Sequence, residues 1–156
     1  MNAVIYLYSY HHGNTRKVAE AMANVLSAPI VELEDDGTAR NSDTSGYDLI
    51  GFGAGIDRGK HYKQILDYAE SLPQASGKKA FIFSTAGIYN EKKKLKDHAA
   101  LRNILAARGF EIVGEFSCLG FDTIIGILKL FGGLNKGRPN AEDLERAKAF
   151  AVGLTK

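Results

Sequence analysis

The chain has 156 residues, 45% of them hydrophobic, which is enough for one domain with a sizeable core and excludes general disorder. The formal net charge of +2 gives little reason to expect a nucleic-acid partner, and the single cysteine, Cys118, excludes an internal disulfide or a cysteine-clustered metal site. No apolar run approaches the length of a membrane span and the start lacks the pattern of a secretory signal, so we expect a cytoplasmic protein.

The first predicted strand is the apolar run from Val4 to Tyr8. It is short and rich in β-branched and aromatic residues, which is typical of a strand buried on both faces. A helix follows, because apolar residues recur at helical spacing from Val18 to Leu26. The polar loop over residues 9–15 therefore joins the carboxyl end of a strand to the amino end of a helix, which is where open α/β sheets bind ligands.

The charges at the start of this helix indicate an anion site. Free backbone N–H groups and the helix dipole attract an anion there, and acidic residues usually occupy the first turn. This helix instead begins with Arg16 and Lys17 and has its first acidic residue at Glu20. A bound anion would explain the inversion, because acidic side chains would repel it. The alternative is an ordinary surface turn capped by Asn14.

Four further strands are predicted over residues 29–34, 47–52, 80–83 and 111–117. The first of these and the last mix polar and apolar residues, as edge strands do, whereas the middle two are almost wholly apolar. Predicted helices separate the strands, including one from Glu91 to Arg108. In the last strand, alternation is expected to put Ile112, Gly114 and Phe116 on one side. This pattern predicts a three-layer, doubly wound α/β fold with a five-stranded parallel sheet in the order 2-1-3-4-5.

In that order the loops after the first and third strands flank one crevice. The second of these loops, residues 53–60, contains three glycines, so its backbone can lie close against a ligand. The loop after the fourth strand, residues 84–90, is expected to border the same crevice. The apolar segment from Ile124 to Phe131 is too short for a membrane span and is interpreted either as a short helix at the ligand edge or as ordinary core.

Two nucleotide-binding motifs are approached but not matched. The P-loop pattern fails between Ala54 and His61, because its first glycine is alanine and its last residue is histidine. The glycines from Gly51 to Gly55 do not form a dinucleotide fingerprint, since they follow the third strand and lack the third glycine at the required step. The sequence therefore does not indicate an NTP or dinucleotide site.

The loop after the first strand resembles that of the flavodoxin family, in which a loop ending Gly-Asn-Thr wraps the phosphate of flavin mononucleotide (FMN). Gly13, Asn14 and Thr15 reproduce that ending, and the strand order and chain length fit a flavodoxin-like fold throughout. The resemblance implies FMN as cofactor, with no catalytic side chain and no metal. It implies a phosphate site at Ser9, His11, His12, Gly13, Asn14 and Thr15. It also implies flavin contacts at Ala54, Gly55, Ile56, Asp57 and Arg58 on one side and at Thr85, Ala86, Gly87 and Tyr89 on the other.

Three features depart from the family pattern. His11 and His12 stand where hydroxyl residues are usual, and they are either phosphate donors or solvated loop residues. The chain has no tryptophan, so Tyr89 is the best candidate to stack on the flavin. Finally, the net charge is positive, whereas flavodoxins are typically acidic.

Lysines crowd the first turns of the helix that begins near Glu91, where positive charge is unfavourable. Lys92, Lys93 and Lys94 are therefore a candidate docking site for a redox partner protein or a nicotinamide donor. A solvated lysine run is the alternative. Cys118 is interpreted as a small core residue rather than a redox thiol.

We expect an FMN-binding electron carrier whose chemistry is supplied by the cofactor. The first alternative is an FMN-dependent reductase of a quinone-like or other planar substrate, bound under the segment from Ile124 to Phe131. The second is a flavodoxin-like module without flavin, used in signalling or scaffolding.

Overall fold

The computed structural model describes residues 1–10, 12–121 and 132–156. Its strands are β1 (Ala3–Tyr8), β2 (Ile30–Glu32), β3 (Leu49–Asp57), β4 (Lys60–His61), β5 (Lys79–Ala86) and β6 (Glu111–Leu119). Its helices are α1 (Asn14–Leu26), α2 (Lys63–Ser71), α3 (Glu91–Asp97), α4 (Ala99–Ala107) and α6 (Ala141–Leu154). The predictions for His11 and for the apolar segment from Ile124 to Phe131 lie outside these residues.

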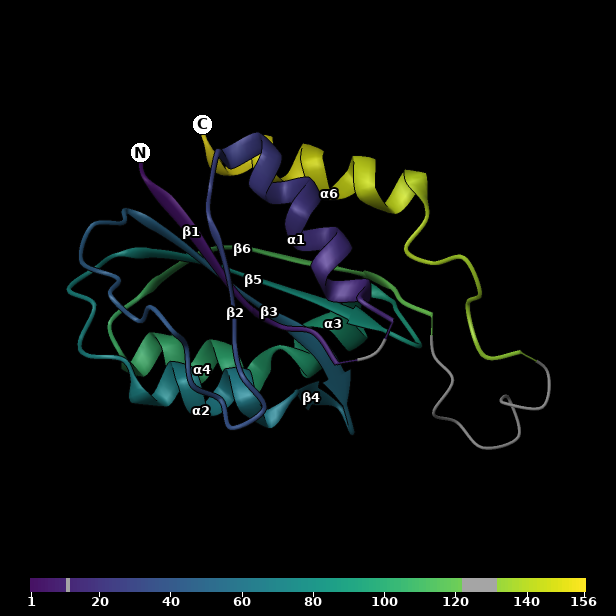
Figure 1. Ribbon diagram of the computed structural model, residues 1–156, viewed down its shortest axis with the longest axis horizontal. Coiled ribbons are helices and arrows are strands. Elements are labelled where there is room, and N and C mark those ends of the chain that lie inside the picture. Colours follow the sequence, from purple (N-terminus) through teal and green to yellow (C-terminus); the bar gives the residue numbers. More distant parts are fainter. Residues whose placement is uncertain (11, 122–131) are drawn as a thin grey trace.

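The sheet has the strand order β2-β1-β3-β5-β6, and every pair along this path is parallel. The predicted doubly wound α/β fold and its strand order are thus confirmed. Figure 1 shows α1 and α6 on one face of the sheet and α2 and α4 on the other. No helix in the described part of the chain is long and apolar enough to cross a membrane.

Two hydrophobic clusters, one on each face, hold the three layers together. Alternate residues of β1 divide between them, because successive side chains of a strand point to opposite faces. Ile5 and Leu7 pack with α1 and α6, whereas Val4 and Tyr6 pack with α2 and α4. All six residues of β1 are buried, as predicted for an interior strand.

The glycines of β3 are explained by packing within the sheet. Gly51 and Gly53 lie directly beside Phe81 and Phe83 of β5, and the two phenylalanine rings cover them. A Cβ atom at Gly53 would come within 2.1 Å of the Phe83 ring. Gly53 therefore makes room for a core aromatic ring, which corrects the prediction that it belongs to a ligand-binding loop.

β3 also runs further than predicted. It continues to Asp57, turns at Arg58 and Gly59, and pairs antiparallel with β4. Most of the expected glycine-rich loop is therefore a β-hairpin. Two strand residues after a glycine turn give too short a pattern to be recognised in the sequence.

Two other local predictions are wrong. The helix expected from Glu91 to Arg108 is divided at His98, a buried residue that ends α3 and precedes α4. In β6 a bulge opposite Ala80 and Phe81 breaks the side-chain alternation. As a result, Ile112 packs with α2 and α4, whereas Phe116 packs on the opposite face.

Candidate functional site

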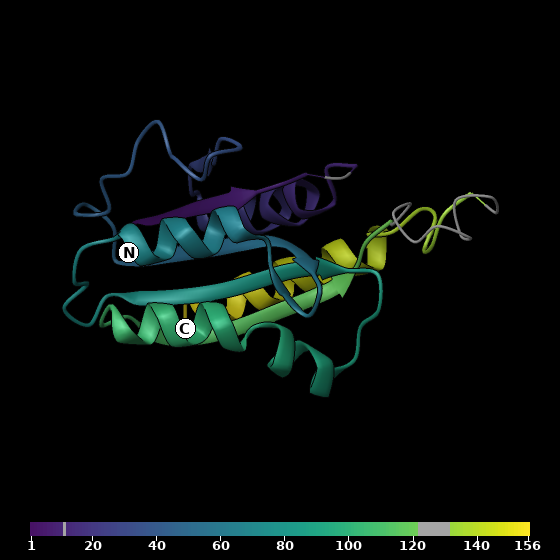
Figure 2. The same ribbon diagram turned by 90° about the horizontal axis from the view of Figure 1, so that it is seen from below.

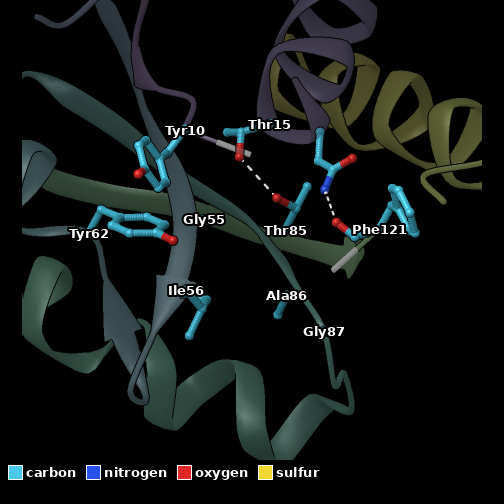
Figure 3. A pocket seen from close by; sticks show the side chains of 11 residues that line it. Tyr10, Thr15, Gly55, Ile56, Tyr62, Thr85, Ala86, Gly87 and Phe121 are labelled. Atoms are coloured by element: carbon cyan, nitrogen blue, oxygen red, sulfur yellow. Dashed lines mark hydrogen bonds between the residues drawn. The ribbon is translucent and has the colours of Figure 1, made fainter. Parts of the chain in front are cut away.

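A pocket opens at the carboxyl ends of β1, β3 and β5, where the predicted crevice lies (Figure 3). It is lined by Tyr10, Asn14, Thr15, Gly55, Ile56, Tyr62, Thr85, Ala86, Gly87, Gly120 and Phe121. Seven of these residues were among the predicted flavin contacts, and they come from three separate segments of the chain. The parallel sheet brings them together, because its strands all end at the same edge.

The amino end of α1 faces this pocket. Its N-cap is Gly13, whose φ of 64° suits glycine, and no side chain in the described chain caps the helix. The alternative that Asn14 caps a surface turn is therefore wrong. The first turn contains no acidic residue, so its backbone N–H groups and the helix dipole favour an anion.

Arg16, one of the two basic residues at the start of α1, has intramolecular partners. Arg16 forms an ion pair with Glu32 of β2, and its other terminal nitrogen lies 3.7 Å from Glu20. The sheet therefore explains Arg16 without a bound anion. The evidence for an anion site lies in the uncapped N–H groups and not in this charge.

Asn14 and Thr15 connect the loop to the far wall of the pocket. The Asn14 Nδ2 group donates a hydrogen bond of 2.8 Å to the Phe121 carbonyl, and this bond fixes the orientation of the amide. The Asn14 Oδ1 atom is then buried with no hydrogen-bond partner in the described residues, as is Ser9 Oγ. Two buried polar atoms beside a helix amino end fit a ligand that carries hydroxyl and anionic groups.

The hydroxyl of Thr15 lies 2.9 Å from that of Thr85, and both residues are buried. This bond joins the first turn of α1 to the end of β5. Thr85 and Ala86, expected in a loop, are the last residues of that strand. Of the four contacts predicted on this side, Gly87 is the one that follows β5 and lines the pocket.

Two tyrosines form an aromatic wall that sequence reasoning missed. The ring centroids of Tyr10 and Tyr62 lie 5.9 Å apart, and Tyr8 contacts both rings. Tyr62 directly precedes α2 and lines the pocket. The Tyr62 ring also lies so close to Gly55 that a Cβ atom there would approach it to 2.9 Å. Glycine at this position therefore preserves the wall.

The remaining wall is held by a segment near the carboxyl end of the chain. The Asn135 Nδ2 group donates to the carbonyl oxygens of Gly87 and Gly120, at 2.7 and 3.3 Å. The Phe121 amide donates to the Arg138 carbonyl. No local sequence pattern indicates that Asn135 joins two pocket residues, because the bonds reach 48 and 15 residues back along the chain.

The other predicted site residues lie around the pocket rather than on its lining. Ala54 is fully buried in the core. Asp57 and Arg58 are exposed at the β3–β4 turn. Tyr89 donates its hydroxyl to Glu91 and lies under the guanidinium of Arg146 on α6.

The described residues of the predicted phosphate loop have different surroundings. Ser9 and Gly13 belong to the loop that leads from β1 to α1. His12 has a φ of 53°, and its ring centroid lies 4.5 Å from that of Phe121. His12 is exposed, and its ring also packs against a pocket residue.

A network of buried polar side chains, which includes His61 and His98, lies beside the β3–β4 hairpin. His61 of β4 lies 3.2 Å from the Phe83 carbonyl, and its ring centroid is 4.7 Å from that of His98. Burial and the neighbouring His98 lower the pKa of His61 to about 3. His98 in turn contacts Ser84 at 2.7 Å and Glu115 at 3.0 Å.

The charge of Glu115 completes this network. Burial alone would raise the pKa of Glu115, but hydrogen bonds from Arg102 and His98 outweigh it and lower the pKa to about 2. The carboxylate therefore stays ionised at neutral pH. It links β6 to α4, on the face of the sheet that carries the hairpin.

Thiol chemistry and metal binding find no support in the part of the chain that the structure describes. Cys118 is fully buried, and burial raises the pKa of its thiol to about 12, which confirms the interpretation as a core residue. No group of three or more histidine, cysteine or acidic side chains in the described ranges could hold a metal ion.

Comparisons with known proteins agree with this architecture. A family model described as a flavodoxin domain matches residues 5–126. A protein of Methanocaldococcus jannaschii, described as uncharacterized, is 46% identical over 156 residues, which are 100% of this chain and 99% of the relative.

Solved structures extend the comparison to the fold. Oxidised flavodoxin 2 from Bacillus cereus has a TM-score of 0.67 at 19% identity, over 98% of this chain and 97% of that one. A flavoprotein in complex with FMN from Lactobacillus acidophilus has a TM-score of 0.60 at 16% identity, over 75% and 93%. Sheet order, pocket position and the family match together show that the chain belongs to the flavodoxin domain family.

Proposed function

We propose that this protein binds FMN in the pocket at the carboxyl edge of the sheet and works as an electron carrier. The observation that carries the proposal is the amino end of α1, which faces the pocket beside the buried Asn14 Oδ1. Within residues 1–10, 12–121 and 132–156, no side chain caps this helix end and no group bonds to that oxygen. A phosphate suits the N–H groups, and a ligand hydroxyl suits the amide oxygen. Membership of the flavodoxin domain family and the FMN complex of a similar structure support the same cofactor.

In this proposal the loop before α1 holds the phosphate. The residues concerned are Ser9, His11, His12, Gly13, Asn14 and Thr15. The backbone N–H groups at the start of α1 bind the anion, and the Asn14 amide accepts from a hydroxyl of the ligand chain. The bond between Thr15 and Thr85 keeps the first turn of α1 fixed against β5, so the donors are preorganised.

The flavin ring of FMN would lie between the two walls of the pocket. Tyr10 and Tyr62 form one apolar wall, and Thr85, Ala86 and Gly87 form the other. Bound FMN supplies the redox chemistry, and the residues bind it, orient it and exclude water. Of the predicted contacts, Gly55 and Ile56 fit this role from β3, whereas Ala54, Asp57, Arg58 and Tyr89 are further from the lining.

The composition of the lining favours a carrier over an enzyme. Among its described residues, only the hydroxyls of Tyr10 and Tyr62 are acidic groups, and no histidine, cysteine or carboxylate lines the pocket. A reductase that protonates a substrate usually needs a general acid with a pKa nearer neutrality. A reductase of planar substrates remains the second candidate, because Tyr10 is 62% exposed at the pocket and offers a ring for stacking.

Spectra and turnover of the purified protein test the proposal. We expect a yellow protein, or one that quenches the fluorescence of added FMN, and reduction by dithionite without steady turnover of a nicotinamide donor and a quinone. Rapid turnover of that pair would favour the reductase. A colourless protein that leaves FMN fluorescence unchanged would contradict both redox functions and favour a module without flavin.

A further inference from the structure

We propose that the β3–β4 turn and the exposed face of α3 form one basic docking surface for an acidic redox protein. The surface consists of Arg58, Lys60, Lys92, Leu95 and Lys96. The proposal rests on the proposed electron-carrier function and names the partner that such a carrier would meet. It differs from the prediction of Lys92, Lys93 and Lys94, because two of those three lysines have carboxylate partners in their own helix.

The turn and the helix are neighbours in space although more than 30 residues separate their centres in the sequence. α3 contacts β4, and Oδ1 of Asp97 lies 3.9 Å from the position that a Cβ atom at Gly59 would take. In Figure 2 the hairpin and α3 lie at the same end of the molecule. Arg58 and Lys60 flank Gly59 and are exposed, so their charges add to those of α3.

The side chains of α3 divide into two groups. Lys93 forms an ion pair with the buried Asp97, and Lys94 pairs with Glu91 at 2.6 Å. Lys92, Leu95 and Lys96 recur at positions i, i+3 and i+4, which share one helix face. All three are exposed, and Leu95 is 55% accessible. None of the ion pairs among the described residues involves Lys92 or Lys96.

This face is unfavourable for the isolated chain. Like charges four residues apart destabilise a helix by about 0.2–0.5 kcal/mol, and a lysine in the first turn opposes the helix dipole. Leu95 adds an apolar side chain in water between the two lysines. The stability of the isolated chain does not explain two exposed lysines beside an exposed leucine. In an interface, Leu95 would form a small apolar centre and the two lysines a basic rim.

The charge of the partner follows from the charge of the surface. Its nearby carboxylates are Asp57, Glu91 and Asp97, and the last two are already paired with lysines. Among the described residues, Asp57 is therefore the one of these three carboxylates without a lysine partner, beside four exposed basic side chains, Arg58, Lys60, Lys92 and Lys96. An acidic partner gains attraction from this excess and is steered toward the surface, most strongly at low salt.

The surface borders the mouth of the pocket proposed to hold FMN. Ile56 of β3 lines the pocket two residues before the turn, and Gly87 lines it four residues before α3. Between Gly87 and α3, Ile88 is 59% exposed, which extends the apolar centre toward the pocket mouth. A protein docked on this surface would thus stand beside the bound flavin. In this proposal the partner carries a reduced iron–sulfur cluster. One electron would pass from that cluster to the bound flavin, so the cluster is oxidised and the flavin is reduced, with no bond formed or broken.

Direct binding tests the docking surface without requiring flavin. A purified acidic [2Fe–2S] ferredoxin is titrated calorimetrically into the full chain at about 20 mM and about 300 mM salt. The pair Lys92→Glu and Lys96→Glu is compared with the control pair Lys79→Glu and Lys156→Glu. Both pairs change the net charge equally, but Lys79 is exposed at the opposite end of β5 and Lys156 ends the chain.

We expect binding at low salt to weaken at least about tenfold in the α3 pair and less than about twofold in the control pair, with the difference vanishing at high salt. Equal losses in both pairs would show an effect of net charge and overturn the proposal, as would absence of binding by the unaltered chain. Binding of anionic lipid vesicles that depends on Lys92 and Lys96, without binding of ferredoxin, would also overturn it in favour of a membrane surface.

The same variants separate this proposal from the proposed function. Reduction of bound FMN by dithionite needs no docking, so it should be unchanged in the α3 pair. Loss of ferredoxin binding with normal FMN reduction would thus concern the surface alone. Failure to bind FMN, with ferredoxin binding retained, would contradict the proposed function and leave the docking surface supported.

Discussion

The hydroxyl oxygens of Thr15 and Thr85 lie 2.9 Å apart although 70 residues separate them in the sequence. This contact joins the amino end of α1 to the end of β5, and both residues line the pocket. The loop that would hold a phosphate and the strand end that would border a flavin ring are therefore one connected structure. The geometry of the site depends on this link.

Replacing either threonine by valine should destabilise the fold by about 1–3 kcal/mol, because the other hydroxyl is left buried without a partner. The double variant Thr15→Val/Thr85→Val should cost less than the sum of the single variants by about 1 kcal/mol. Urea denaturation of the four proteins measures this coupling. The exposed Thr155→Val is the control and should change stability by less than about 0.5 kcal/mol. Additive losses would show that the two hydroxyls do not interact.

Gly53→Ala tests whether the glycines of β3 serve packing. An added methyl group would lie 2.1 Å from the Phe83 ring, so we expect a loss of at least about 2 kcal/mol in the free energy of unfolding. Gly46→Ala is a matched control, because no atom of the described residues lies within 4 Å of its Cβ position and its φ is not positive. Similar stability of the two variants would contradict the packing role.

His61 makes stability depend on pH. Its pKa is about 3 in the folded protein and about 6.5 when exposed, so the unfolded chain binds the extra proton as the pH falls below about 6.5. Stability is fully present above that pH, and we expect a loss of roughly 2 kcal/mol between pH 7 and pH 5. His61→Gln should remove most of this loss in urea titrations. Between pH 8 and pH 7 the two proteins should show the same change, and equal slopes below pH 6.5 would contradict the assignment.

Asn135→Gly tests the clamp on the pocket wall. Glycine tolerates the φ of 58° but removes the amide that donates to the carbonyls of Gly87 and Gly120. We expect affinity for FMN and for riboflavin to fall equally, by about five- to tenfold, since the clamp lies on the ring side of the proposed site. Fluorescence titration with FMN and with riboflavin measures the two affinities. A loss confined to FMN would place the phosphate near Asn135 instead.

The sequence predicted the sheet and its order because burial and periodicity reflect forces that act along a single strand. β1 and β5 are buried on both faces and read as apolar runs, while β2 and β6 are partly exposed and read as mixed patterns. The bulge near Ile112 could not be foreseen, because it depends on how β6 registers against β5. The β3–β4 hairpin was not predicted for the same reason, since β4 is defined by its pairing with β3.

Site residues were predicted where a motif within one segment of the chain identifies them. They were missed where their role depends on contacts between distant segments. The Gly13 to Thr15 ending identified the loop. The role of Tyr62 depends on its packing against Gly55 and Tyr10, which no helical pattern encodes. Gly120 and Asn135 join the pocket through hydrogen bonds to residues far away in the chain. Tyr89, the expected stacking residue, instead engages Glu91 and Arg146.

The most direct test of the account is the affinity for FMN relative to riboflavin, measured by fluorescence quenching of the unaltered chain and of Gly13→Val. A phosphate held by charge-assisted hydrogen bonds at α1 should make FMN bind at least about 100-fold more tightly than riboflavin. Valine is strained at a φ of 64° and should reduce that ratio by shifting the loop, while riboflavin affinity changes little. Equal affinities for the two ligands in the unaltered chain would contradict a phosphate site at α1.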